Sequence, residues 1–168
     1  NAKNQNQTRC IAIGRPGGLE QLRLITLKEN TLTVGYNLRN VSLPPFAVIP
    51  SSINDRNSAV PSDCVILRNQ YFSVNYADCT IRWGLYESAK QYVGYPIVPG
   101  FDVAGVVECV GDSADDEPGK FQKGDRVFGC TLFGAYSDRV LIPKLQLRKI
   151  PDGISTKEAA AIPAVSLT

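Results

Sequence analysis

Short apolar segments separated by glycine and proline run along most of the chain, and they restrict the folds that it can adopt. The segment 103–111 is apolar almost throughout, which is typical of a strand buried on both faces. Many short strands joined by turns favour a β-barrel or a β-sandwich. We therefore predict a mainly β domain, with strands at 8–13, 22–27, 64–74, 103–111, 124–127, 134–142 and 147–150.

The hydrophobic period changes after the third predicted strand, and the new period predicts a helix over 76–83. Asp78 and Arg82 are four residues apart, a spacing at which opposite charges pair on another face of the helix. Gly84 is expected to end the helix. The apolar face carries four side chains at helical spacing, Tyr76, Cys79, Thr80 and Trp83.

A second helix is predicted near the end of the chain. Ser155 and Glu158 have the spacing of a capping box, in which each side chain accepts a hydrogen bond from the backbone of the other residue. We expect this helix to begin after Ser155 and to continue through the alanines toward Pro163.

The stretch 37–62 differs from the rest of the chain. It holds several prolines and the polar run SSINDRNS, and no helical period passes through it. We expect a long loop or an insertion at 37–62.

Composition excludes several classes of function. The chain has 18 basic and 16 acidic residues mixed along its length. This balance of charge predicts no nucleic-acid partner. No apolar run approaches the ~20 residues that a membrane-spanning helix needs. The absence of histidine excludes a Ser-His-Asp mechanism and removes the commonest zinc ligand. The five cysteines lack a C-x-x-C spacing and are expected to be reduced thiols, as in a cytosol-like compartment.

No dinucleotide-binding fingerprint is present in the 168 residues. Gly17 and Gly18 form a lone pair, and the glycines in 100–105 lack the G-x-G-x-x-G spacing that precedes a helix. We therefore expect no Rossmann domain within this chain.

From Asp63 to Thr168 the chain resembles the N-terminal, GroES-like domain of the medium-chain dehydrogenase/reductases. The resemblance covers about two thirds of the chain, and its motifs come in the order of the family. The matching segments are SVNYADCTIRWGLY (73–86), PIVPGFDVAGVVECVGDS (96–113), KGDRVFG (123–129), GAYSDRVLIP (134–143) and KIPDGISTKEAAAIPAVSLT (149–168).

The zinc-binding members of that family differ from this chain at the ligand positions. Where they carry a cysteine ligand, this sequence has Asn75, and their histidine and glutamate after a glycine fall on Phe101 and Asp102. Neither Asn75 nor Phe101 is a good zinc ligand. Their four-cysteine structural lobe has no counterpart after Val127, so the resemblance implies a zinc-free protein with no bound metal.

The zinc-free branch includes quinone oxidoreductases and vesicle amine transport protein-like proteins, and its N-x-x-D motif matches Asn75 and Asp78. Resemblance to this branch implies hydride transfer from NADPH to a quinone or an α,β-unsaturated carbonyl. It implies that Asn75 contacts the nicotinamide or the substrate carbonyl, because a carboxamide both donates and accepts hydrogen bonds. Thr168 matches a threonine near the nicotinamide in the family. Asp78, Tyr86 and Phe101 are predicted to line the substrate cleft.

Structural roles compete with these assignments. Asn75 follows a strand and precedes a helix, where asparagine is a common N-cap. Asp78 can serve the helix through its pairing with Arg82. Tyr76 and Trp83 are expected to belong to the core, since they lie on the apolar face of the helix.

The resemblance also predicts how the chain is divided. Residues 1–154 are expected to form the substrate domain, a GroES-like, partly open β-barrel with a few short helices. Residues 155–168 are expected to form the first helix leading into a Rossmann domain that this chain lacks. That domain would bind most of the NADPH, so the chain alone is expected to be inactive and monomeric. The complete protein is expected to be a cytoplasmic homodimer, with peripheral membrane or organellar association as the alternative.

The sequence is compatible with two other functions. The ending AAAIPAVSLT resembles enoyl-reductase modules of polyketide and fatty acid synthases equally well. The run PGFDVAGVVECVGDS is similar to the vesicle protein-like branch, in which the fold can serve as a non-catalytic interaction or lipid-binding module.

Overall fold

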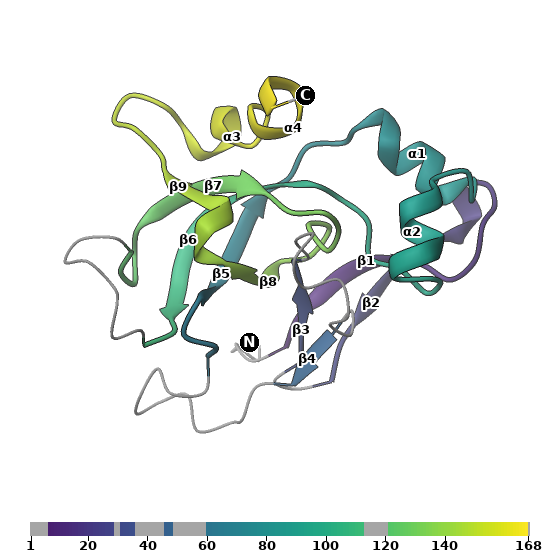
Figure 1. Cartoon of the computed structure of the whole chain (residues 1–168), viewed down its shortest axis with the longest axis horizontal. Helices are drawn as coiled ribbons and strands as arrows, with labels where there is room; N and C mark the ends of the chain where they lie inside the picture. The colour runs from purple at the N-terminus through teal and green to yellow at the C-terminus, as the bar shows by residue number, and fades with distance from the viewer. Residues whose placement is uncertain (1–6, 29–30, 36–45, 49–59, 113–120, 168) are drawn as a thin grey trace, which may run out of the picture.

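Two β-sheets form the body of the molecule in the computed structural model, which describes residues 7–28, 31–35, 46–48, 60–112 and 121–167 (Figure 1). The strands are β1 (Arg9–Ile13), β2 (Leu22–Thr26), β3 (Thr31–Val34), β4 (Phe46–Val48), β5 (Cys64–Tyr71), β6 (Asp102–Val110), β7 (Arg126–Cys130), β8 (Arg139–Pro143) and β9 (Leu147–Lys149). The smaller sheet pairs β1 with β2, and the larger has the order β4-β3-β8-β5-β6-β7-β9. All pairings are antiparallel except that of β3 with β8.

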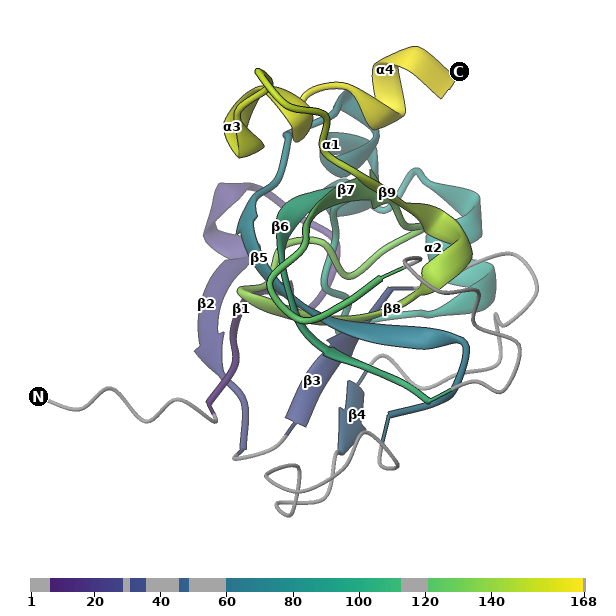
Figure 2. The same cartoon turned by 90° about the vertical axis from the view of Figure 1, so that its left-hand side faces the viewer.

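The larger sheet curls strongly (Figure 2), and its two central strands show why. The pairing of β5 with β6 shifts register twice, the second time between Asn69 and Tyr71. Such irregularities bend a strand and increase its twist. Gly105 of β6 lies so close to β5 that a Cβ atom there would come within 2.1 Å of the Arg68 carbonyl oxygen. Glycine therefore permits the close approach of the two strands.

β5 supplies side chains to two hydrophobic clusters because successive residues point to opposite faces of a strand. Val65 and Leu67 enter a cluster with valines of β6 and β7. Cys64 and Ile66 enter another cluster on the opposite face. All four side chains are buried, which explains why this segment is apolar without alternation.

Four short helices lie outside the sheets in the described part of the chain. They are α1 (Tyr76–Arg82), α2 (Glu87–Tyr92), α3 (Thr156–Ala159) and α4 (Pro163–Leu167), and the 3₁₀ turns η1 (Leu19–Gln21) and η3 (Lys144–Gln146) add to them. α1 and α2 lie beside each other at one side of the molecule, and α3 and α4 lie together above β7 and β9 (Figure 1). None of the helices in the described part of the chain is long and apolar enough to cross a membrane. The predicted mainly β domain with a few short helices is confirmed.

The predicted capping box at the last helical segment is confirmed, but the helix is shorter than expected. The Glu158 backbone N–H donates to Ser155 Oγ at 3.2 Å, and the Ser155 N–H donates to the Glu158 carboxylate at 2.9 Å. α3 ends at Ala159, and α4 starts at Pro163. Proline lacks the N–H that continues a helix but fits the first helical position, so the segment divides into two helices.

The region before β5 contains strands that the sequence did not predict. β3 was missed because its four residues, TLTV, are too few for a recognisable period. β4 lies inside the stretch 37–62, so the expectation of a loop throughout that stretch is wrong at 46–48. Residues 37–45 and 49–59 lie outside the described residues.

α1 buries a different face from the one that the sequence predicted. Tyr76 is 76% exposed and Trp83 is 44% exposed, so the expectation that they belong to the core is wrong. The buried face carries Asp78, Ile81 and Arg82 instead. Polar side chains can face inward here because hydrogen bonds replace the water that they lose.

Candidate functional site

Three polar side chains meet where β5 ends, α1 begins and β6 begins. The Asn75 Nδ2 atom lies 3.0 Å from Ser73 Oγ and 3.0 Å from Asp102 Oδ2. The Ser73 hydroxyl in turn donates to Asp102 Oδ2. Asp102 is 1% exposed, whereas Asn75 is half-buried, so the carboxamide lies between a buried carboxylate and the surface.

The other oxygen of Asp102 reaches a distant part of the chain. The Ala164 backbone N–H, in α4, donates to Asp102 Oδ1 at 2.7 Å. One carboxylate thus accepts hydrogen bonds from the end of β5, from the start of α1 and from α4. Donors on three sides suit an ionised carboxylate, which only accepts.

Asp78 holds Asn75 from the opposite side, through the backbone. Its Oδ2 atom accepts from the Asn75 N–H at 2.8 Å and from the Tyr136 hydroxyl at 3.0 Å, and its Oδ1 atom accepts from the Gly100 N–H at 2.9 Å. Burial raises the pKa of the Asp78 carboxyl, although these hydrogen bonds act to lower it. Burial, followed by the charge of Asp78, also raises the pKa of Tyr136, so its phenol stays protonated and donates.

Arg82 is not the partner of Asp78, and that part of the prediction is wrong. The Arg82 guanidinium donates to the Gly17 carbonyl oxygen at 2.7 Å and lies 5.4 Å from the centre of the Trp83 ring. It therefore ties α1 to the turn after β1. Asp78 faces the interior, where the backbone of Gly100 and the phenol of Tyr136 replace the expected cation.

Asn75 also begins α1 as its N-cap, as the structural alternative predicted. Its backbone N–H completes a capping box with the Asp78 carboxylate. The carboxamide nitrogen faces Ser73 and Asp102, and the carboxamide oxygen lies toward the first turn of α1. The capping role therefore places the side chain and leaves it able to meet a ligand.

Phe101 and Tyr86 pack into an aromatic cluster. The Phe101 ring lies 6.0 Å from the Tyr86 ring and 5.8 Å from the Phe133 ring, and Tyr86 lies edge-on to Phe133 at 6.2 Å. Phe101 is buried, and Tyr86 is half-buried at the edge of the cluster. Asp78 is joined to this region by its bond to Gly100, the residue before Phe101. Thr168 lies outside the described residues.

The side chains at the family's zinc position form a poor donor set for that metal. Phe101 has no ligand atom, and the Asn75 nitrogen faces a carboxylate. Burial, with the charge of Asp102 second, raises the pKa of Cys130 to about 11, so this thiol is protonated at neutral pH. Among the described residues, no group of three or more His, Cys, Asp or Glu side chains could hold a metal ion.

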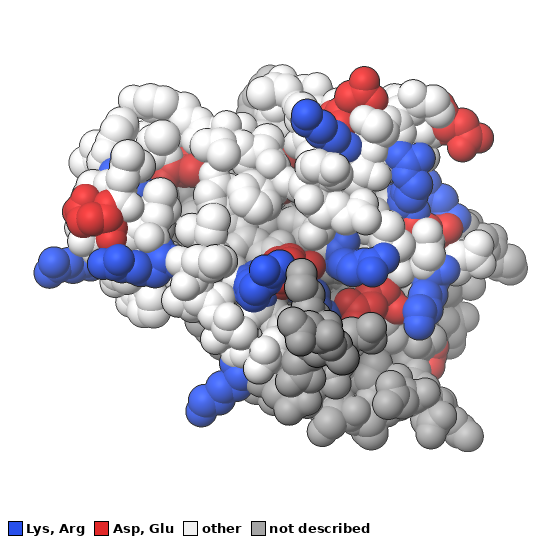
Figure 3. Space-filling model, turned by 180° about the vertical axis from the view of Figure 1, so that it is seen from behind, with Lys and Arg blue, Asp and Glu red and all other residues white. Residues whose placement is uncertain are grey.

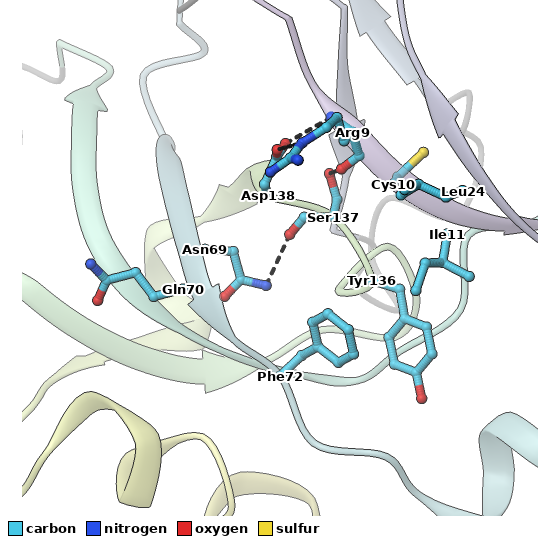
Figure 4. A pocket seen from close by; sticks show the side chains of 10 residues that line it. All are labelled: Arg9, Cys10, Ile11, Leu24, Asn69, Gln70, Phe72, Tyr136, Ser137 and Asp138. Atoms are coloured by element: carbon cyan, nitrogen blue, oxygen red, sulfur yellow. Dashed lines mark hydrogen bonds and ion pairs between the residues drawn. The ribbon is translucent and has the colours of Figure 1, made fainter. Parts of the chain in front are cut away.

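A pocket of ≈ 330 Å³ adjoins this site, because Tyr136, which donates to Asp78, is also one of the residues that line it (Figure 4). Sequence reasoning did not predict the pocket. Asn69 forms its polar wall and is fully engaged: Nδ2 donates to the Ser137 carbonyl oxygen at 3.2 Å, and Oδ1 accepts from the Ala104 N–H at 3.1 Å. These contacts join strands, so Asn69 has a structural role and Asn75 stays the candidate site residue. The pocket is lined by Arg9, Cys10, Ile11, Leu24, Asn69, Gln70, Phe72, Tyr136, Ser137 and Asp138.

Charges are mixed on the face shown in Figure 3, where basic and acidic side chains lie next to each other. Among the described residues, oppositely charged side chains also pair directly, as Arg139 Nη2 does with Glu108 Oε1 at 2.8 Å. A nucleic-acid site needs a continuous basic patch. The described residues on this face form no such patch.

Sequence reasoning missed Ser73, Tyr136 and Ala164 and considered Asp102 only as a replaced zinc-family residue. A signal for Asp102 was present, since it is an acidic residue directly before the apolar run 103–107 of β6. An unpaired carboxylate is costly at a buried position, so such a residue predicts hydrogen-bond donors nearby. Nothing local indicates that Ala164 is one of them.

Comparisons with known proteins find both similar sequences and similar structures. Residues 61–152, more than half of the chain, match the family described as Alcohol dehydrogenase GroES-like domain. The chain is 36% identical over 104 residues to a probable quinone oxidoreductase of Schizosaccharomyces pombe, covering 62% of this chain and 29% of that protein. It is 39% identical over 105 residues to human quinone oxidoreductase, covering 61% of this chain and 30% of that protein.

A solved structure extends the similarity beyond the matched segment. The crystal structure of a human synaptic vesicle membrane protein VAT-1 homolog-like protein superposes with a TM-score of 0.68 at 26% identity. The superposition covers 94% of this chain and 40% of that one. The chain therefore spans less than half the length of the relatives that it matches.

Proposed function

This chain belongs to the alcohol dehydrogenase GroES-like domain family, and we propose that it is the substrate-side domain of an NADPH-dependent quinone or enone oxidoreductase that works without zinc. The observation that carries the proposal is the Asn75 carboxamide, held by Asp102 on its side chain and by Asp78 on its backbone. Two relatives named quinone oxidoreductases, at 36% and 39% identity, support the reaction class.

The geometry suits a domain that positions reactants. NADPH, when bound, supplies the hydride, so the protein must place the acceptor carbon beside the nicotinamide. Asn75 is suited to this role because its backbone and its side chain are both anchored in the protein. Its half-buried carboxamide can then contact the nicotinamide or the substrate without losing its own orientation. Thr168 is proposed as a second residue near the nicotinamide.

The aromatic cluster supplies the apolar side of the proposed cleft. Tyr86 is half-buried beside Phe101 and Phe133, and a quinone or enone ring can pack against its exposed edge. The poor donor set at Asn75 and Phe101 supports hydride transfer without a metal-bound substrate oxygen.

The test uses the complete protein that contains this chain. We expect it to bind NADPH and to oxidise it when an ortho-quinone or an enone is added, with no stoichiometric zinc by elemental analysis. Asn75→Ala should lower kcat/KM at least tenfold, while Gln70→Ala, which changes an exposed amide side chain, should leave it unchanged. Failure to bind NADPH even at high concentrations of the cofactor would refute the proposal. One zinc per chain would refute its zinc-free part.

A second candidate function is a non-catalytic interaction module. The exposed apolar side chains around α1 favour it, because Val74 is 73% exposed and Leu85 is 70% exposed, beside Tyr76. Similarity to the VAT-1 homolog-like protein is compatible with either role. Absence of NADPH binding together with an unchanged fold would select this candidate.

A further inference from the structure

The carboxamide of Asn75 has two chemically different ends, and the structure treats them differently. Its nitrogen points to Ser73 Oγ and to Asp102 Oδ2, both at 3.0 Å. A carboxylate can accept hydrogen bonds but cannot donate them, so Asp102 favours the nitrogen end and repels the oxygen end. The alternative orientation, with the oxygen facing Asp102, would place two acceptors against each other.

Asp102 itself cannot easily turn away from Asn75. Its Oδ1 atom is engaged by the Ala164 N–H at 2.7 Å, and Oδ2 also accepts from the Ser73 hydroxyl. The side chain is 1% exposed, so no water can replace these donors. The orientation of the carboxamide is therefore decided by a buried, immobile carboxylate.

We propose that Asp102 is a positioning residue that keeps the Asn75 oxygen facing the ligand, so that this position recognises an N–H or O–H donor. The proposal rests on the proposed function, since it describes how the same site selects its ligand. The oxygen lies toward the first turn of α1, and a carboxamide oxygen has two acceptor positions, so it can serve the capping box and a ligand together. A ligand group that only accepts hydrogen bonds, such as the carbonyl of a quinone, does not match it, so a contact with the substrate would form with the hydroxyl of its reduced form.

Two ligands can supply such a donor, the carboxamide N–H of a nicotinamide and the hydroxyl of the reduced substrate. For the cofactor, the acetylpyridine analogue of NADP⁺ keeps the carbonyl and lacks the N–H, whereas the thionicotinamide analogue keeps the N–H and has a weak acceptor in place of the oxygen. For the substrate, thymol carries a hydroxyl donor that its methyl ether lacks. Each pair separates donation from acceptance with little change in shape.

The experiment measures dissociation constants by calorimetry on the complete protein, so it does not depend on turnover. We expect the acetylpyridine analogue to bind about tenfold more weakly than NADP⁺, and the thionicotinamide analogue to bind within about threefold of it, because one neutral hydrogen bond is lost only in the first. The opposite order would show that the amide nitrogen faces the ligand and would overturn the proposal. If the cofactor analogues bind alike but thymol binds about tenfold more tightly than its ether, the donor belongs to the substrate and the proposal holds.

The variants separate positioning from general structure. Asn75→Ala should abolish the preference for ligands that carry a hydrogen-bond donor. Asp102→Asn should reduce it to less than about threefold, because an amide at 102 accepts either end of Asn75. Gln70→Ala should keep it. If Asp102→Asn gives too little folded protein, Ser73→Ala removes one of the two acceptors and should reduce the preference to about threefold.

The outcomes distinguish this inference from the function on which it rests. Binding of NADP⁺ with no preference in either pair, or a preference that Asp102→Asn leaves intact, would overturn the role of Asp102 and leave the proposed function standing. Absence of NADP⁺ binding would overturn the proposed function, and a thymol preference lost in Asn75→Ala would then still support the inference.

Discussion

Asp78 and Asp102 are both buried carboxylates beside Asn75, and the difference between them lies in what they hold. Asp78 accepts hydrogen bonds from two backbone N–H groups and from a phenol, so it holds the start of α1 against the barrel. Asp102 accepts hydrogen bonds from a side-chain amide, a hydroxyl and one backbone N–H. Loss of Asp78 should therefore affect folding first, and loss of Asp102 should affect ligand selection first.

Replacement of Asp78 should have the largest effect on stability. Asp78→Ala removes the acceptor of three hydrogen bonds and leaves the Gly100 N–H buried without a partner. At about 1 kcal/mol for each hydrogen bond, we expect the free energy of unfolding to fall by about 3 kcal/mol, measured by urea unfolding. A loss below about 1 kcal/mol would show that Asp78 does not hold α1.

The same carboxylate predicts a dependence on pH. Burial raises the pKa of Asp78 above its ordinary value of 3.8 in the folded protein. Its favourable contribution is then complete below pH 3.8 and is lost as the pH rises through the raised pKa. Asp78→Asn cannot titrate, so the stability of the wild-type protein relative to this variant should fall between acid and neutral pH. Urea unfolding at several pH values measures this, and a relative stability that rises with pH would contradict it.

Asp102→Asn should destabilise less than Asp78→Ala. The asparagine keeps one acceptor oxygen and the volume of the side chain, but it brings an amide into a space already filled by the donors of Ser73, Asn75 and Ala164. We expect a loss of about 2 kcal/mol in the free energy of unfolding, together with the loss of ligand preference described above. A larger loss than that of Asp78→Ala would reverse the comparison of the two carboxylates.

Tyr136→Phe isolates one bond of Asp78. It removes the hydroxyl that donates to Asp78 at 3.0 Å and keeps the ring, which stacks on Phe72 with the centres 4.3 Å apart. We expect a loss of about 1 kcal/mol in thermal or urea unfolding. In the Asp78→Ala background the same change should cost much less, and equal costs in both backgrounds would mean that the bond contributes nothing.

A substitution on the exposed face of α1 should have the smallest effect on stability, and it serves as the control for Asp78→Ala. Tyr76→Ser changes a large apolar residue on the same helix as Asp78, but Tyr76 is 76% exposed. We expect the free energy of unfolding to change by less than about 0.5 kcal/mol. A loss comparable to that of Asp78→Ala would mean that the outer face of α1 is packed against something in the folded protein.

Local rules predicted most of the strands and both ends of α1. The segment 64–71 was recognisable because it is apolar on both faces, and Asn75 was recognisable as an N-cap because it separates a strand from a helix. β3 and α2 were missed because four and six residues carry too little pattern. The burial of Tyr76 and Trp83 was predicted wrongly, because hydrophobic spacing shows which residues share a face of a helix but does not show which face is buried.

The sequence contains enough local information for the mainly β architecture, the capping box at Ser155 and the N-cap role of Asn75, because each depends on residues close together in the chain. It does not contain, in any local pattern, the partners of the two carboxylates. Asp102 meets Asn75 across 27 positions and Ala164 across 62, and Asp78 meets Tyr136 across 58. These hydrogen bonds exist because β5, β6 and the segment before β8 come together in the folded barrel, and burial then requires that each polar atom find a partner there.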